Sequence, residues 1–133
     1  MNEKDQRNYD LQERLIEFEV RVLNVVESLP NSRVGKPNSR VGNHVAGQLI
    51  RSGTSAAPNY GEAQSAESRK DFIHKMKVAL KELRETLVWL LIIQRKPLVE
   101  PLDKCSPLID ENNELISIFV ASIATAQKNL KKE

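Results

Sequence analysis

The chain has 133 residues, a length that fits a single domain able to bury its own core. A hydrophobic fraction of 40% and a charged fraction of 29% are those of a globular protein and exclude collagen-like or disordered classes. The net charge of +2 is too small for a protein coated in nucleic acid, unless its cations gather on one face. The single Cys105 excludes an internal disulfide framework and favours a reducing compartment. The longest apolar run, Leu87 to Ile93, falls well short of the roughly 20 residues that span a bilayer, so we expect a soluble, cytoplasmic protein with no membrane contact.

A first helix is predicted from Asp10 to Leu29, because apolar residues recur there every three or four positions and Pro30 follows. Its core stripe consists of Leu11, Leu15, Phe18, Val22, Val25 and Leu29. A second apolar row, formed by Ile16, Val20 and Leu23, falls on the opposite side at about 100° per residue. One stripe is enough for a bundle core. The second row therefore indicates a partner surface, or else scattered exposed apolar residues of the ordinary kind.

Residues 31–44 contain a tandem seven-residue echo, Asn-Ser-Arg-Val-Gly, repeated from Asn31 and from Asn38. Two short units cannot build a solenoid, so we interpret the echo as a duplication inside a loop, where insertions cost little. The duplicated loop lengthens the first connection and brings Arg33 and Lys36 into it.

The segment from Val45 to Ala63 has helical spacing but poor helix formers, among them Gly47, Gly53 and Pro58. We predict a second helix that is kinked at Pro58 and whose small residues let a neighbour approach closely. A loop from Ser52 to Ser68 is the alternative. A polar row along this helix is either a buried hydrogen-bond network or the solvent side; it consists of Gln48, Ser52 or Ser55, Asn59 and Glu62.

A third helix should begin after Ser68, which forms a capping pair with Asp71, and continue to about Arg95. Its predicted core stripe is Phe72, Met76, Leu80, Leu83, Leu87 and Leu90. Beyond Leu87 the helix is apolar all round, more than one bundle core can bury. We therefore expect a subunit contact that includes Val88, Trp89, Ile92 and Ile93.

The last helix is expected from Pro107, a residue suited to a first helical turn, to about Leu130. Four amphipathic helices without a strand signal predict an all-α fold, an antiparallel up-down-up-down four-helix bundle with a kinked second helix. We place it in a single domain over residues 8–131.

The sequence favours no catalytic, metal or cofactor chemistry. A di-iron site needs two Glu-x-x-His pairs, and Asp71 with His74 supplies the spacing only once. Nothing near Cys105 would lower the pKa of its thiol, and no glycine-rich phosphate loop occurs. One enzymatic alternative remains, because Arg69 and His74 resemble the Arg-x4-His element of HEPN ribonucleases, where such a pair stabilises the phosphorane and moves the proton.

Basic residues are the more informative pattern. On the third helix they project within a sector about 60° wide that flanks the predicted core stripe, namely Lys70, Lys77, Lys81, Arg84 and Arg95. Upstream, no acidic residue occurs between Glu27 and Glu62, whereas Arg33, Lys36, Arg40 and Arg51 do. These nine residues are the predicted nucleic-acid-binding set, since phosphate attraction grows with the number of contacts. The alternative is a solvated face balanced by Glu–Lys pairing.

The central segment resembles a known family. It reads Arg51-Ser-Gly-Thr-Ser-Ala-Ala-Pro-Asn-Tyr-Gly-Glu62, then Arg69-Lys-Asp-Phe-Ile73, then Ala79-Leu-Lys-Glu-Leu-Arg-Glu85. This pattern is similar to the bacterial four-helix-bundle family encoded in intervening sequences of 23S ribosomal RNA genes, which is akin to the accessory protein of diversity-generating retroelements. The resemblance implies an antiparallel four-helix bundle, a ring-like homopentamer and no catalytic residues. For the retroelement branch it implies binding to a reverse transcriptase and to RNA or DNA.

Together these patterns predict a non-enzymatic, self-associating bundle that acts as a binding or assembly module for RNA or a ribonucleoprotein partner. A purely structural or protein-binding scaffold is the first alternative, and a HEPN-like ribonuclease is the second.

Overall fold

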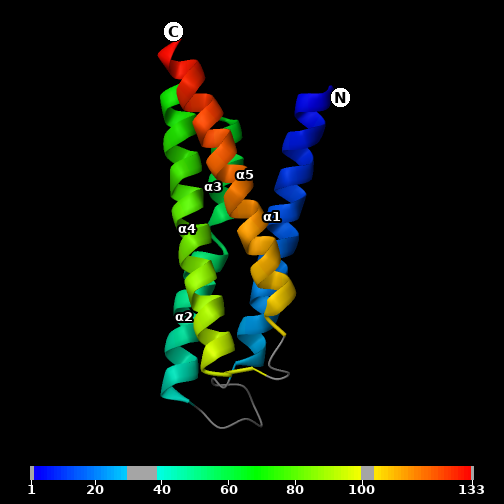
Figure 1. The fold of residues 1–133 in the computed structure, drawn as a ribbon, viewed down its shortest axis with the longest axis vertical. Helices are drawn as coiled ribbons and strands as arrows, with labels where there is room; N and C mark the ends of the chain where they lie inside the picture. The colour runs from blue at the N-terminus through cyan, green and yellow to red at the C-terminus, as the bar shows by residue number, and fades with distance from the viewer. Residues whose placement is uncertain (1, 30–38, 100–103, 133) are drawn as a thin grey trace.

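The computed structural model describes residues 2–29, 39–99 and 104–132, and these are entirely helical apart from short turns (Figure 1). Two of the predicted basic residues, Arg33 and Lys36, lie outside the described residues. The helices are α1 (Glu3–Ser28), α2 (Arg40–Gly53), α3 (Ala56–Gln64), α4 (Arg69–Arg95) and α5 (Ser106–Lys131).

The helices form an antiparallel bundle in which α2 and α3 together make one interrupted rod, and both chain termini lie at the same end (Figure 1). α1 packs against α2, α3 and α5, and α4 packs against the same three helices. α1 and α4 are therefore diagonal to each other. The predicted fold class, a four-helix bundle with a bent second helix, is confirmed.

Local capping explains where the helices begin. Oδ1 of Asn2 accepts from the backbone N–H of Asp5 at 2.9 Å, so α1 begins seven residues before the predicted Asp10. Ser39 caps α2 by accepting from the N–H of Gly42 at 3.0 Å. Part of the second copy of the duplicated echo is therefore helical, which corrects the expectation that the whole of residues 31–44 is a loop. The capping role predicted for Ser68 is confirmed by its 3.0 Å bond to the N–H of Asp71.

The interruption between α2 and α3 lies at Thr54 and Ser55, four residues earlier than expected. Pro58 is its cause, because proline has no N–H to donate to the carbonyl of Thr54 and its ring excludes a continuous helix there. Pro58 itself sits in the first turn of α3, where no N–H is needed. The side chains of Thr54 and Ser55 turn back to the carbonyls of Ile50, at 2.7 Å, and Arg51, at 2.5 Å.

The core runs along the bundle axis and includes the whole predicted stripe of α1, with Leu11 only partly buried. On α4 the stripe is rotated from the prediction. Phe72, Leu80 and Leu87 are only partly buried, while the smaller Ala79 and Thr86 are buried in the stripe, Thr86 with its hydroxyl bonded to Ser52 of α2. The residues that α4 buries are Ile73, Met76, Ala79, Leu83, Thr86, Leu90 and Ile93.

Candidate assembly and nucleic-acid-binding surfaces

The outward face of α1 carries an apolar ridge. Ile16, Val20 and Leu23 are 42%, 45% and 36% exposed, on the side of the helix away from its buried stripe. Glu13 and Glu17 are exposed beside them. We call these five residues the α1 ridge. Large aliphatic side chains gathered on one face, rather than scattered singly, are typical of a surface that another molecule covers.

The outward face of α4 combines cations with apolar residues. Val88 and Ile92 are 53% and 39% exposed. Five exposed basic residues share this face, namely Lys70, Lys77, Lys81, Arg84 and Arg95. None of the five makes an ion pair with another residue in the described part of the chain. We call this set the α4 ridge. It lies opposite the buried side of α4 rather than flanking it, because the core stripe is rotated.

Two residues of the predicted subunit contact lie elsewhere. Ile93 is fully buried in the core of its own chain, so its assignment to an outward surface was wrong. It completes the inward stripe of α4, one turn after Leu90. Trp89 is half-buried, and its ring meets that of His44 of α2 edge-on, with 5.9 Å between ring centroids and 69° between planes. An apolar run in the sequence therefore divides among three environments.

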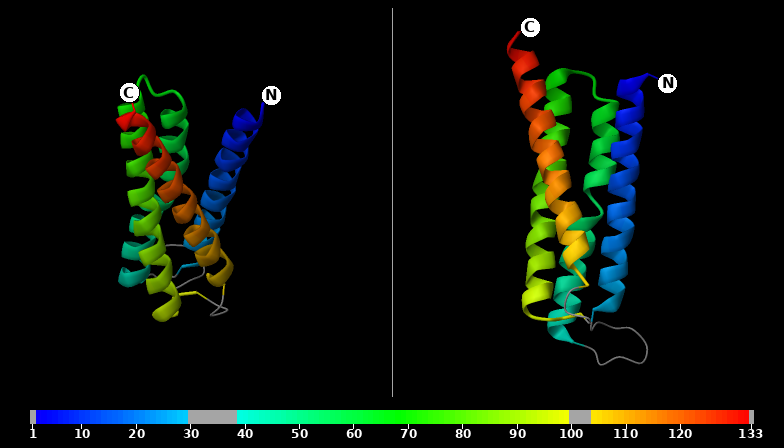
Figure 2. Two further views of the ribbon diagram at one scale, coloured as in Figure 1. Left: turned by 45° about the horizontal axis from the view of Figure 1, so that its top comes forward. Right: turned by 45° about the vertical axis from the view of Figure 1, so that its right-hand side comes forward.

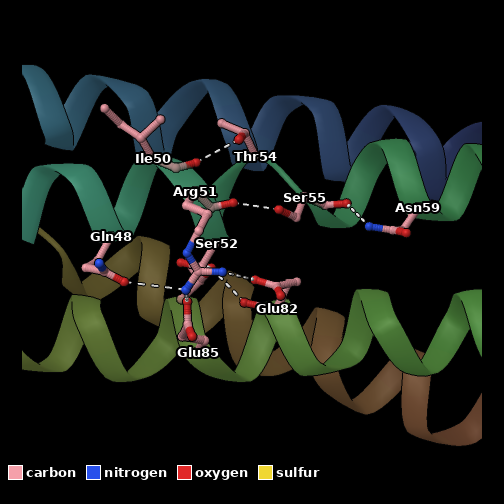
Figure 3. A network of polar contacts seen from close by, with 10 residues as sticks. Gln48, Ile50, Arg51, Ser52, Thr54, Ser55, Asn59, Glu82 and Glu85 are labelled. Carbon is pink, nitrogen blue, oxygen red and sulfur yellow. Dashed lines mark hydrogen bonds and ion pairs between the residues drawn. The ribbon is translucent and has the colours of Figure 1, made fainter.

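Arg51, predicted to contact nucleic acid, joins two helices instead. Figure 3 shows its guanidinium reaching from α2 to α4, where it pairs with Glu85 and, at 3.5 Å, with Glu82. It also donates to Oε1 of Gln48 at 3.5 Å. The two carboxylates offset the charge of Arg51. In turn, Arg51 engages Glu82 and Glu85, two of the three acids that α4 carries, and leaves Asp71 at its first turn.

The polar row of the interrupted rod is divided between a buried and an exposed part. The hydroxyls of Ser52 and Thr86 lie 3.1 Å apart, buried between α2 and α4. Asn59 donates to the carbonyl of Ser55 across the interruption at 2.8 Å (Figure 3). At its far end Glu62 is exposed and accepts from Lys75 of α4 at 2.8 Å. Both predicted alternatives are thus correct for different members of the row.

Glu19 of α1 has a role that the sequence pattern did not indicate. Its carboxylate accepts from the N–H of Ala57 at 2.6 Å and so caps α3, whose own N-cap residue makes no side-chain cap bond. Burial raises the pKa of Glu19 to about 7, while the bond from Ala57 acts in the opposite direction. A capping residue supplied by another helix leaves no local spacing to recognise.

A cleft also escaped the sequence patterns. α1 and α5 diverge toward the end that holds the termini (Figures 1 and 2), and a cleft of about 1010 Å³ opens there. Its lining includes Leu11, Tyr60, Phe72 and Ile118. Arg69 lies at this cleft, whereas His74 is exposed outside it. The two residues of the HEPN-like element therefore do not share one hollow.

The remaining chemical candidates are few. Cys105 is fully buried, and burial raises the pKa of its thiol, which disfavours a thiolate. Over residues 2–29, 39–99 and 104–132, no group of three His, Cys, Asp or Glu side chains is placed to hold a metal ion. Within the same ranges, no helix is both long and apolar enough to cross a membrane.

The fold and its surfaces thus define the class of this protein, an all-α bundle with two outward apolar ridges. The family model of the 23S rRNA-intervening sequence proteins matches residues 7–121, and the chain belongs to that family. A crystal structure of a protein with unknown function from the S23 ribosomal protein family of Bacteroides thetaiotaomicron has a TM-score of 0.71 and 30% identity. That similarity covers 85% of this chain and 97% of the other. No curated protein matches.

Proposed function

We propose that this protein is a non-enzymatic, cytoplasmic assembly module that self-associates through its outward ridges into a homopentamer. The observation that carries the proposal is the presence of exposed apolar rows on two diagonal helices, Ile16, Val20 and Leu23 on α1 and Val88 and Ile92 on α4. Covering a half-exposed aliphatic side chain is worth roughly 1 kcal/mol, so both rows favour association. The family resemblance supports five copies.

Light scattering on the purified protein tests self-association. We expect a mass near five times the 15.1 kDa of one chain, and Leu23→Asp or Val88→Asp should lower it, because each places a charge in a covered apolar contact. Val120→Asp is the matched control, since Val120 is 44% exposed on α5, outside both ridges. A wild-type protein that remains a 15.1 kDa monomer at micromolar concentration would contradict the proposal.

A second function is supported by the charge of α4. We propose that the assembled protein binds RNA, or a ribonucleoprotein such as a reverse transcriptase with its template, through the exposed cations of that helix. Glu82 and Glu85, which lie beside the middle of this row, are engaged by Arg51. Because a ring repeats the row once per subunit, a modest net charge per chain still yields many phosphate contacts.

Fluorescence anisotropy with labelled RNA at increasing salt tests this second function. Affinity should fall steeply with salt, and Lys70→Glu with Lys77→Glu should weaken binding and flatten the salt dependence. Lys128→Glu with Lys131→Glu at the end of α5 makes the same change of charge elsewhere and is the control. Weak retention that does not respond to salt would favour the purely structural scaffold.

The same RNA distinguishes binding from cleavage. A HEPN-like ribonuclease would shorten the labelled RNA, and His74→Ala would abolish that activity. We expect the RNA to stay intact with both the wild-type protein and the variant.

A further inference from the structure

The two ridges differ in charge. On α1 the exposed acids Glu13 and Glu17 border the apolar row, while Arg14 turns away toward Glu111 of α5. On α4 the exposed residues around Val88 and Ile92 are basic, and Arg51 holds the neighbouring acids. One outward surface is therefore apolar and acidic, and the other is apolar and basic. Surfaces of this kind are complementary to each other and repel their own kind.

The ridges also match along the bundle. α1 and α4 both begin at the end that holds the termini and run in the same direction (Figures 1 and 2). At a rise of 1.5 Å per residue, Leu23 lies about 30 Å along α1 and Val88 about 28 Å along α4. Glu17 and Arg84 lie at about 21 Å and 22 Å. When the two helices lie side by side in parallel, Val20 and Leu23 come level with Val88. Glu17 comes level with Arg84, and Glu13 with Lys81, while Ile16, at about 20 Å, lies beside the stems of these two basic residues.

A single chain cannot make this contact with itself, because α1 and α4 are diagonal in its bundle. We propose that the α1 ridge of one copy packs in parallel against the α4 ridge of the next copy, with Glu17 facing Arg84 and Glu13 facing Lys81. The inference rests on the self-association proposed above and specifies its geometry. Each copy then uses two different surfaces, and such a heterologous contact closes into a ring when the rotation between neighbours divides a full turn.

This arrangement decides which part of the α4 ridge stays open. Lys81, Arg84, Val88 and Ile92 are covered by the neighbouring copy. Lys70 lies about 1.5 Å from the start of α4, whereas the α1 ridge begins with Glu13 at about 15 Å along α1, so no member of the α1 ridge faces Lys70. A second copy of the chain is favoured over nucleic acid as the occupant of the α4 ridge from Lys81 to Ile92, because the apolar Val88 and Ile92 offer no hydrogen bond or charge to a phosphate backbone.

Cysteine cross-linking tests the pairing directly. Leu23→Cys and Val88→Cys are made separately and together, and each protein is treated with a short bismaleimide; the native Cys105 is buried and serves as the unreactive background. The double variant should give a ladder of cross-linked species that ends at the size of the ring. A mixture of the two single variants should give dimers, and neither single variant alone should give any. Dimers from Leu23→Cys alone would show that like ridges pair and would overturn the proposal.

Charge reversal tests the polar part of the contact. Glu13→Lys with Glu17→Lys makes both ridges basic, and Lys81→Glu with Arg84→Glu makes both acidic. Like charges then face each other, so each variant alone should dissociate about tenfold more readily than the wild type. The two variants mixed, or all four changes in one chain, should restore assembly. Circular dichroism verifies that each variant is folded, which is expected because all four side chains are exposed.

The outcomes separate this inference from the function on which it rests. A wild-type protein that is monomeric refutes self-association itself. A wild-type assembly that is unaffected by both charge reversals, or that cross-links only between like ridges, refutes the α1–α4 contact and leaves self-association intact.

Discussion

Glu19 offers a sharp test of how the interrupted rod is held. Its carboxylate caps α3 from a neighbouring helix, and burial raises its pKa from 4.5 to about 7. Below pH 4.5 the group is protonated in the folded and the unfolded chain alike. Between pH 4.5 and 7 the folded protein holds a proton that the unfolded chain has released. The free energy of unfolding contributed by this group therefore falls as pH rises through that window and is constant above it.

The size of the effect follows from the same pKa. A rise from 4.5 to about 7 corresponds to about 3 kcal/mol. Because Glu19 is partly exposed, solvent screening should reduce this to ~1.5 kcal/mol. Glu19→Gln removes the ionisation and keeps an oxygen that can accept from the N–H of Ala57. We compare the free energy of unfolding of the variant with that of the wild type at each pH. The difference, in favour of the variant, should be ~1.5 kcal/mol larger at pH 8 than at pH 4.

Urea unfolding followed by circular dichroism, repeated from pH 4 to pH 8, measures this difference. Glu67→Gln is the control, because Glu67 is exposed in the turn before α4, and its profile should run parallel to that of the wild type. A Glu19→Gln variant whose advantage stays constant with pH, or shrinks as pH rises, would refute the reasoning. It would mean that the cap favours the ionised carboxylate by at least as much as burial disfavours it.

Four further predictions concern packing and charge. A Cβ on Gly53 would lie 2.6 Å from Cγ1 of the buried Val22, so Gly53→Ala should cost about 1–3 kcal/mol in urea unfolding. A Cβ on Gly47 would have no neighbour within 4 Å, so Gly47→Ala should stabilise the helix by about 1 kcal/mol. A loss of stability in this variant would contradict the placement of Gly47 on an open side of the helix. Asn112 is fully buried, and neither polar atom of its side chain has a partner in the described residues, so Asn112→Leu should raise the melting temperature; a fall would reveal a partner that stabilises the amide. The hydrogen bond from Arg14 lowers the pKa of Glu111, so Glu111→Gln should lose less than about 1 kcal/mol of stability near pH 7, and this deficit should shrink as the pH falls below 4.5. A deficit that does not change with pH would indicate lost packing instead.

Much of the fold could be predicted because its signals are local. The spacing from Leu11 to Leu29 identified the buried side of α1, and Ser68 identified the start of α4. Pro58 indicated an interrupted second helix, although its position moved to Thr54 and Ser55. Each of these features depends on residues within one or two turns of one another, where backbone geometry alone determines which side chains share a face.

The surfaces were predicted less completely. The outward row of Ile16, Val20 and Leu23 was identified correctly, because the buried stripe of α1 is unambiguous. On α4 the apolar residues extend all round the helix, so periodicity could not separate the buried Ile93 from the exposed Val88. The pairing of Arg51 with Glu82 and Glu85 joins residues more than thirty positions apart and leaves no pattern in either segment.

The sequence by itself determined that four amphipathic segments form helices and that two of them carry more apolar surface than one core can cover. Only the tertiary structure decided which way α4 is rotated, that Glu19 caps α3, and that α1 and α5 diverge around a cleft. The reason is physical. Helical periodicity reports which residues share a face, whereas the neighbour that each face meets depends on how whole helices pack against one another.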